Sequence, residues 1–310
     1  MEDGAFRKDN IKDMTVAIGI DLGGTRIKAA ALDENGNVLQ QSYTPTKDGS
    51  DSTWKHTVLT AVDELAEKVG DRNVVVGISA PGIPDRENSC ISYMPGRLEG
   101  IEGFDWSSFL KRKTFVLNDA VAALIAEAKL GAAKNKKNAV LLTLGTGVGG
   151  AILIDGKPYQ GSFQKAGHIG HTAINHEDDP DVTGMPGSLE DAIGNCTIQK
   201  RSLGKFNDTH ALLEAYRLGD DFARWVWLSS VRKLAIGIAS VVNILSPECV
   251  VMAGGITEAG DDLFQPLANF LSVYEWRPGG SSCLILKAHF GDMAGAIGAA
   301  CFAVAQAANH

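Results

Sequence analysis

The sequence predicts an α/β protein with two similar halves, and three observations support this fold class. Apolar, β-branched runs of strand length alternate with runs of helical periodicity along the chain. A unit of strand, glycine turn, strand and hairpin signal occurs at residues 15–43 and again at 138–156, which indicates an internal duplication. The length of 310 residues suits two domains, each able to bury its own core.

The first unit contains a turn with the pattern Asp-x-Gly-Gly-Thr at residues 21–25, between strand-like runs at 15–20 and 26–32. Backbone amides at such a glycine turn can face an anion. Thr25 adds a hydroxyl, and Asp21 offers a carboxylate to a hydrated metal ion. These groups suit a nucleoside triphosphate with Mg2+, although an ordinary hairpin with a glycine-rich corner explains the same residues.

The remaining elements follow from periodicity and from breakers. Asn35-Gly36 predicts a hairpin before a strand at 38–43. Short strands are expected at residues 73–79, 114–117 and 248–253. Helices are expected at residues 54–69, 120–130 and 230–245, from about residue 261, and near the C-terminus at 293–309. Residues 86–106 are expected to be loop-like, and the turn-rich stretch 157–195 is long enough to indicate a functional loop.

The second glycine turn, residues 145–150, also satisfies the pattern G-x-G-x-x-G. A dinucleotide site requires a helix directly after the glycines and an acidic residue about 20 positions later. Here a strand and the Asp155-Gly156 hairpin signal follow, and no Asp or Glu lies near Lys165. The dehydrogenase interpretation is therefore rejected.

Composition excludes several function classes. The net charge of −8 argues against nucleic acid as the main partner. The five cysteines lie far apart, which indicates free thiols in a reducing compartment. Residues 1–10 lack the apolar core of a signal peptide, and the uncharged run 293–309 is short of a spanning helix. We expect a cytoplasmic protein that does not interact with membranes.

Taken in order, the motifs resemble the ROK family in the sugar kinase branch of the actin-like ATPase superfamily. The order and spacing of the motifs run from about residue 15 to residue 300, which is almost the whole chain. It depends on the first turn with Lys28, the loop Pro81-Gly82, the pair Asn118-Asp119, and the segments 144–150, 167–171, 187–190 and 253–255. One glycine turn is weak evidence, whereas the ordered set is specific.

The resemblance implies two actin-like (ribonuclease H-like) lobes with mixed sheets flanked by helices and a cleft between them. The smaller lobe would comprise residues 1–120 plus about 290–310, and the larger lobe residues 121–289. ATP and Mg2+ would bind in the cleft with a sugar, and Asp21 would hold Mg2+ through water. The ATP-binding residues would be Asp21, Gly23, Gly24, Thr25 and Lys28 at the first phosphate motif, Thr143, Gly145, Thr146 and Gly147 at the second, and Gly254 and Gly255 at the adenosine motif.

By the same resemblance, Asp119 is the catalytic base. A carboxylate between a strand and a helix suits this role, because a sugar hydroxyl needs an acceptor for its proton. Alternatively, Asn118 or Asp119 only caps the following helix. The sugar-binding residues would be Gly82, Asn118, Asp119, His168, His171 and Glu190.

The sequence departs from the family pattern at several positions. His168 stands where the family has Glu, and Tyr93 stands near a family Asn, so the identity of the sugar is open. The two histidines can also be loop residues without a ligand. Many family members hold a structural Zn2+ with one His and three Cys, but this chain has Ser188 at the last Cys position. We predict no zinc.

The leading functional hypothesis is ATP-dependent phosphorylation of a hexose or N-acetylhexosamine, at O6 and with a glucose-type sugar favoured. A non-catalytic sugar sensor is the main alternative, because of the change at His168. A transcriptional regulator of the same family is a third hypothesis, but only about 14 residues precede the first strand, too few for a DNA-reading domain. The resemblance also suggests a homodimer.

Overall fold

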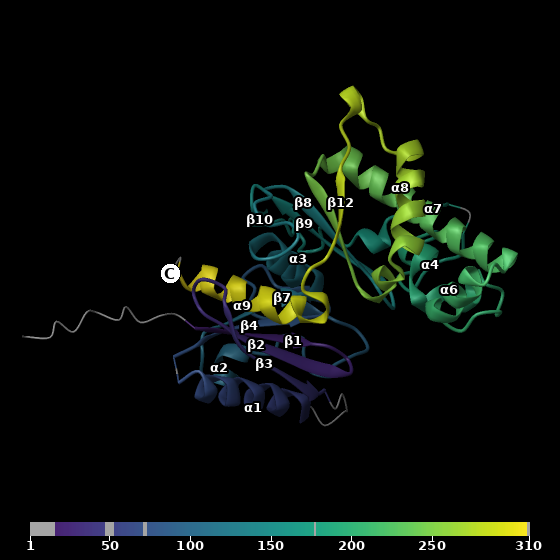
Figure 1. Cartoon of the computed structure of the whole chain (residues 1–310). Coiled ribbons are helices and arrows are strands. Elements are labelled where there is room, and N and C mark those ends of the chain that lie inside the picture. The colour runs from purple at the N-terminus through teal and green to yellow at the C-terminus, as the bar shows by residue number, and fades with distance from the viewer. Residues whose placement is uncertain (1–15, 47–52, 71–72, 177, 309–310) are drawn as a thin grey trace, which may run out of the picture.

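The computed structural model describes residues 16–46, 53–70, 73–176 and 178–308. Two five-stranded sheets lie on opposite sides of helices α3 (Asp119–Lys129) and α9 (Ala294–Ala307) (Figure 1). Thr15, at the start of the first predicted strand, and the predicted absence of a leader at residues 1–10 lie outside the described residues. The predicted α/β fold class is confirmed.

The first sheet has the strand order β3-β2-β1-β4-β7. β2 and β3 continue from β1 as an antiparallel meander, whereas β4 and β7 run parallel to β1. The strands are β1 (Ala17–Leu22), β2 (Arg26–Leu32), β3 (Val38–Pro45), β4 (Val75–Ala80) and β7 (Thr114–Asn118). The other elements of this half are α1 (Thr53–Lys68), α2 (Trp106–Leu110) and the short pair β5 (Ile83–Pro84) and β6 (Ile91–Tyr93).

The second sheet has the order β10-β9-β8-β11-β12, with β11 and β12 parallel to β8. Its strands are β8 (Ala139–Leu144), β9 (Val148–Ile154), β10 (Lys157–Pro158), β11 (Cys249–Ala253) and β12 (Leu284–Lys287). The helices of this half are α4 (Leu189–Ile193), α5 (Ile198–Arg201), α6 (Thr209–Arg217), α7 (Asp221–Leu245) and α8 (Asp261–Tyr274). Single 3-10 turns are η1 (Ile169–His171), η2 (Asn195–Thr197), η3 (Gly255–Ala259), η4 (Pro278–Gly280) and η5 (Gly291–Met293).

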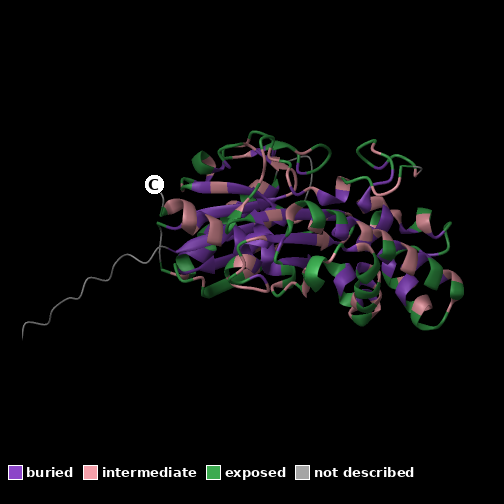
Figure 2. Ribbon diagram, turned by 90° about the horizontal axis from the view of Figure 1, so that it is seen from above, coloured by how far each residue is buried: buried purple, intermediate pink, exposed green. Residues whose placement is uncertain are grey.

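The two sheets have the same strand order and the same strand directions, and each is followed by a helix, α3 after the first and α9 after the second. Both predicted glycine turns join the first two strands of their sheets. The internal duplication that the sequence indicates is therefore present in the topology. Figure 2 shows the buried residues concentrated along the strands, with exposed residues on the outer helices and loops.

Helix α9 packs against β1 and β4 on one side and against α3 on the other. This close approach requires small residues. A Cβ on Gly19 of β1 would collide with the carbonyl oxygen of Ala296, and a Cβ on Gly298 would collide with the carbonyl oxygen of Ala122 in α3. The Ala- and Gly-rich C-terminal run is therefore a packed helix that joins the two halves. The lobe limits expected from the resemblance, 1–120 with about 290–310 and 121–289, stay a prediction.

Three of the differences between the predicted and the observed elements concern β6, α7 and α3. The loop expected at 86–106 contains β6, which pairs with β5. The helix expected at 230–245 begins earlier, at Asp221, where the side chain of Asp220 accepts a hydrogen bond from the Ala223 amide. The helix expected at 120–130 begins at Asp119.

Among the described residues, α7 alone is long and apolar enough to cross a membrane, judged by length and composition. It packs against α4, α6 and α8, and its buried residues belong to the core of the second half. This is the environment of a core helix.

Candidate functional site

The first glycine turn, which we call the first corner (residues 21–25), begins with a carboxylate that three strands hold in place. Asp21 pairs in register with Lys28 on β2, and the Lys28 Nζ lies 3.3 Å from Asp21 Oδ2. Ser79 on β4 donates its hydroxyl to Asp21 Oδ1 at 2.8 Å. Lys28 also donates to the carbonyl oxygen of Asp292, just before α9, at 2.8 Å. The neighbouring ends of β1, β2 and β4 therefore hold the predicted metal-binding carboxylate and the ammonium group of Lys28 side by side.

The turn itself is closed by backbone hydrogen bonds. The Gly23 amide donates to the carbonyl oxygen of Arg26 at 3.1 Å, and Thr46 donates its hydroxyl to the carbonyl oxygen of Gly23 at 2.6 Å. Gly24 and Thr25 are exposed at the tip. The predicted phosphate-binding groups therefore lie on a fixed turn whose tip a ligand can reach.

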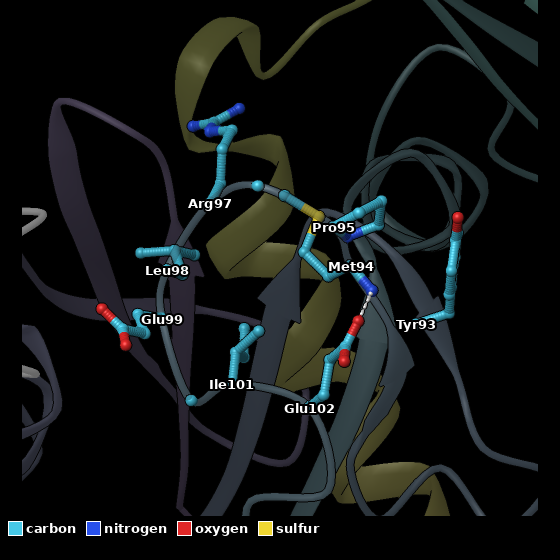
Figure 3. A pocket seen from close by; sticks show the side chains of 10 residues that line it. Tyr93, Met94, Pro95, Arg97, Leu98, Glu99, Ile101 and Glu102 are labelled. Atoms are coloured by element: carbon cyan, nitrogen blue, oxygen red, sulfur yellow. Dashed lines mark hydrogen bonds between the residues drawn. The ribbon is translucent and has the colours of Figure 1, made fainter. Parts of the chain in front are cut away.

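Arg97 is a candidate site residue that the sequence analysis did not identify. It belongs to the loop 93–102, which lines a cavity of about 910 Å³. Figure 3 shows the Arg97 side chain near the middle of this loop, pointing away from Glu99 and Glu102, while Glu102 accepts a hydrogen bond from the Met94 amide. The guanidinium lies over the first corner, since a Cβ on Gly24 would collide with Arg97 Nη2. No motif marks this arginine, because only the path of the loop brings it to the corner.

The pair Asn118-Asp119 lies at the start of α3, and the hydrogen bonds show which of the two caps the helix. Asn118 caps α3, because its side-chain oxygen accepts from the amides of Ala120 and Val121. Its Nδ2 donates to the carbonyl oxygen of Gly82 at 3.0 Å, which links it to the loop after β4. Asp119 is thus not needed as the cap, although its Oδ1 also accepts from the Ala120 amide at 2.8 Å.

Asp119 lies between the two corners. Water reaches its side chain, yet protein surrounds the carboxylate on several sides at the start of α3. Burial, and next the negative charge of Asp21, raise the pKa of Asp119 to about 6, and the charge of Arg97 opposes the shift. The neighbouring Ala120 approaches Gly149 of the second glycine turn, where a Cβ would lie 3.7 Å away. A carboxylate in this position can accept a proton near neutral pH.

The second glycine turn, which we call the second corner (residues 143–150), is braced by side-chain oxygens. Thr143 accepts a hydrogen bond from the Gly149 amide at 3.1 Å. Glu190 at the start of α4 accepts from the Val148 amide at 2.9 Å, and a Cβ on Gly147 would collide with its carboxylate. Glu190, which was expected to bind sugar, is therefore anchored to the corner that was expected to bind phosphate.

The expected adenosine residues lie beside the second corner. A cavity of about 290 Å³ is lined by residues that include Gly145, Thr146, Gly255, Ile256 and Leu213. Gly254 has a positive φ of 90°, and a Cβ there would collide with the carbonyl oxygen of Leu144. This glycine lets η3 turn next to the corner, so a partly apolar cavity adjoins the turn that was expected to bind phosphate, an arrangement that suits a nucleoside.

The histidines of the predicted sugar site lie at the two ends of η1: His168 precedes it, and His171 is its last residue. Their rings are nearly parallel, with centroids 6.5 Å apart. His168 Nδ1 lies 3.0 Å from the carbonyl oxygen of Lys165, and burial lowers the pKa of His168. His171 Nδ1 lies 3.5 Å from the carboxylate of Asp181, which the sequence analysis did not select.

The sequence analysis expects Mg2+ and predicts no zinc, and the residues of the structure suit these two metals to different degrees. Asp21 offers a carboxylate of the type that Mg2+ binds through water and phosphate oxygens. At the family's zinc position, Ser188 caps α4 by accepting from the Asp191 amide at 3.1 Å. No cluster of three or more His, Cys, Asp or Glu side chains suitable for a metal occurs in the described part of the chain. The loop does not offer the thiolates of a tetrahedral zinc site.

The comparisons with known proteins identify the family of the chain. Residues 17–306 match the model described as the ROK family. The glucokinase of Streptomyces coelicolor is 30% identical, over 93% of this chain and 97% of that protein. The crystal structure of a ROK hexokinase from Thermus thermophilus superposes with a TM-score of 0.86 at 27% identity, covering 96% of this chain and all of that one. A ROK family glucokinase from Streptomyces griseus in complex with glucose and AMPPNP gives a TM-score of 0.75 at 25% identity, covering 93% and 99%.

Other matching relatives differ in activity. They include an N-acetylgalactosamine kinase at 29% identity and two transcriptional regulators at 25% and 26% identity. This chain spans 74% and 71% of the regulators' lengths. The sugar and any regulatory role therefore have to be argued from the site.

Proposed function

The chain belongs to the ROK family and is a sugar kinase with the actin-like fold, and we propose that it transfers the γ-phosphoryl group of ATP to O6 of a hexose or N-acetylhexosamine. A glucose-type sugar is favoured. The observation that carries this proposal is the environment of Asp119, a carboxylate with a pKa raised to about 6 between the two glycine corners.

The corners support the phosphoryl-transfer step by positioning. The exposed tip of the first corner and the backbone of the second would hold the phosphates, with the adenosine in the cavity beside Gly255. Lys28 and Arg97 supply positive charge at the first corner. Mg2+ held by Asp21 would supply charge neutralisation on the phosphate oxygens. In a reaction of this type the protein contributes chiefly positioning and electrostatic stabilisation.

Asp119 would accept the proton of the attacking sugar hydroxyl. Asn118 fixes the start of α3 and is tied to the carbonyl oxygen of Gly82, so the carboxylate next to it is held against a defined loop. The sugar hydroxyls would meet Asn118, His168, His171 and Glu190, which can accept or donate hydrogen bonds. A hydroxyl-specific site of this kind discriminates strongly between sugars, because a missing hydroxyl leaves a polar group unpaired.

The test is ADP release measured with ATP and a panel of aldohexoses, ketohexoses and N-acetylhexosamines, followed by NMR of the product to identify the phosphorylated oxygen. We expect turnover with a glucose-type sugar and a 6-phosphate product. Turnover with none of these sugars, together with tight sugar binding in calorimetry, would support the sensor hypothesis that the change at His168 raises.

A further inference from the structure

We propose that Asp181 is a positioning residue that fixes the tautomer and orientation of His171, in the loop where the family resemblance implies a structural metal. The inference rests on the proposed function, in which His171 receives a sugar hydroxyl. The loop 179–188 does not suit a zinc site, because it has no cysteine. It contains instead the buried carboxylate of Asp181.

Asp181 organises its own loop through one oxygen. The side chain is 0% exposed, and its Oδ1 accepts from the Thr183 amide at 2.8 Å, from the Thr183 hydroxyl at 2.6 Å and from the Met185 amide at 3.1 Å. Burial opposes ionisation of this carboxyl, but hydrogen bonds from Thr183 outweigh it and hold the pKa of Asp181 well below its usual range. Asp181 is therefore a carboxylate at every physiological pH.

The second oxygen of Asp181 faces His171. Asp181 Oδ2 and His171 Nδ1 lie 3.5 Å apart, and both are buried atoms that make no hydrogen bond of standard geometry within the described residues. A buried polar atom without a partner is costly, so we assign these two atoms to each other across the 3.5 Å that separates them. Because a carboxylate can only accept, the proton of His171 must lie on Nδ1. The opposite nitrogen, Nε2, is then an acceptor in the neutral ring.

His168 has the same arrangement. Its Nδ1 lies 3.0 Å from the carbonyl oxygen of Lys165, which also can only accept, so Nδ1 carries the proton. Burial lowers the pKa of His168, which keeps the ring neutral at pH 7. Two nearly parallel imidazoles thus have their Nδ1 atoms tied to the protein and their Nε2 atoms left as acceptors. A pair of acceptors suits neighbouring sugar hydroxyls and would replace the acceptor oxygens of the family's Glu.

The loop also connects His171 to Glu190. Residue pairs Ala173–Ser188 and Pro180–Pro186 form isolated bridges, and the Leu189 amide donates to the carbonyl oxygen of Thr172 at 3.0 Å. His171 is 35% exposed at its side chain, so one edge of the ring remains accessible while the Nδ1 edge is held. The carboxylate therefore does for this loop what a bound metal would do: it joins the loop to the histidine.

The decisive variant is Asp181→Asn. An asparagine oxygen can keep the hydrogen bonds from Thr183 and Met185, but its amide nitrogen then faces His171 as a donor. His171 should move its proton to Nε2 and lose its acceptor. Two-dimensional ¹⁵N–¹H NMR of the imidazole rings in the full-length protein without sugar should show Nδ1–H in the wild type and Nε2–H in the variant. A wild-type His171 protonated on Nε2 overturns the proposal whether or not the chain phosphorylates any sugar.

Kinetics of the same variant give a second readout. The sugar KM should rise about tenfold, the size expected when a hydroxyl donor meets another donor, while the ATP KM stays unchanged. Asp181→Asn combined with His171→Ala should be no worse than His171→Ala alone, because both changes remove one interaction. Additive effects would assign Asp181 a purely structural role and overturn the proposal. Asp179→Asn, at a side chain that is 79% exposed, is the matched control and should leave both readouts unchanged.

Discussion

The two glycine corners occupy equivalent places in a duplicated topology, yet different side chains flank them. The first corner is flanked by Lys28 and by the guanidinium of Arg97. The second corner is braced by the carboxylate of Glu190 and by the hydroxyl of Thr143. Duplication has therefore kept the backbone turn while its side chains have diverged. We infer that side-chain cations assist the first corner, whereas the second contributes mainly backbone amides and stiffness.

The largest effect is expected at the carboxylate between the corners. Asp119→Asn should lower kcat by about 10²–10⁴-fold, because the sugar hydroxyl loses its proton acceptor. The change is nearly isosteric, and Asn118 already caps α3, so the helix and the sugar affinity should be preserved. Coupled ADP release gives kcat, and calorimetry gives the sugar Kd. A variant with near-normal kcat would remove Asp119 from the mechanism.

The next largest effect is expected when the positive charge of Arg97 is removed from the first corner. It is measured as the pH dependence of kcat/KM. Since the pKa of Asp119 is raised to about 6, kcat/KM of the wild type should fall as the pH drops through about 6, where the base becomes protonated. Arg97→Ala should move this acid limb to higher pH, because the positive charge that favours the carboxylate is gone.

Arg97→Ala should also lower kcat/KM at pH 8 by about tenfold, as expected for the loss of a charge-assisted contact to phosphate. The matched control is Arg224→Ala on the exposed side of α7, which should change neither the limb nor the rate. An unshifted acid limb in the Arg97 variant would mean that the two corners do not differ electrostatically in the way we infer.

The corners were predictable from the sequence because their chemistry is local. An apolar run, glycines and a hydroxyl within a few residues specify a tight turn after a strand, and both such turns join the expected strands. The side chains that distinguish the corners were not predictable in this way. Arg97 reaches Gly24 only through the path of the loop 93–102, and Glu190 was assigned to the sugar although its carboxylate accepts from the Val148 amide.

The same limit applies to the sugar site. The family pattern includes His171, but it expects cysteine thiolates in the loop 179–188. It therefore gives no indication of a carboxylate at Asp181. The contact becomes evident only when both atoms are found buried and facing each other. The pair Asn118-Asp119 is an intermediate case, since residue type predicted both a cap and a base, and only the hydrogen bonds assign the cap to Asn118.

The smallest effect is expected from a matched pair of glycine substitutions, one at each corner. The pair tests how rigidly the side chain next to each glycine is held. Neither Gly24 nor Gly147 has a positive φ, so alanine costs no backbone strain at either corner. A new methyl group would collide with Arg97 at the first corner and with Glu190 at the second. The end of an exposed arginine can move aside, whereas Glu190 is held by the Val148 amide.

Gly147→Ala should therefore lower Tm by about 2–6 °C, the range for modest overpacking, while Gly24→Ala should lower it by less than about 1 °C. Thermal unfolding without ligands measures this difference, because neither phosphate nor sugar is then present to add its own contacts. Equal Tm values for the two variants would show that Glu190 yields as easily as Arg97. The second corner would then owe its shape to its backbone hydrogen bonds and not to the carboxylate that braces it.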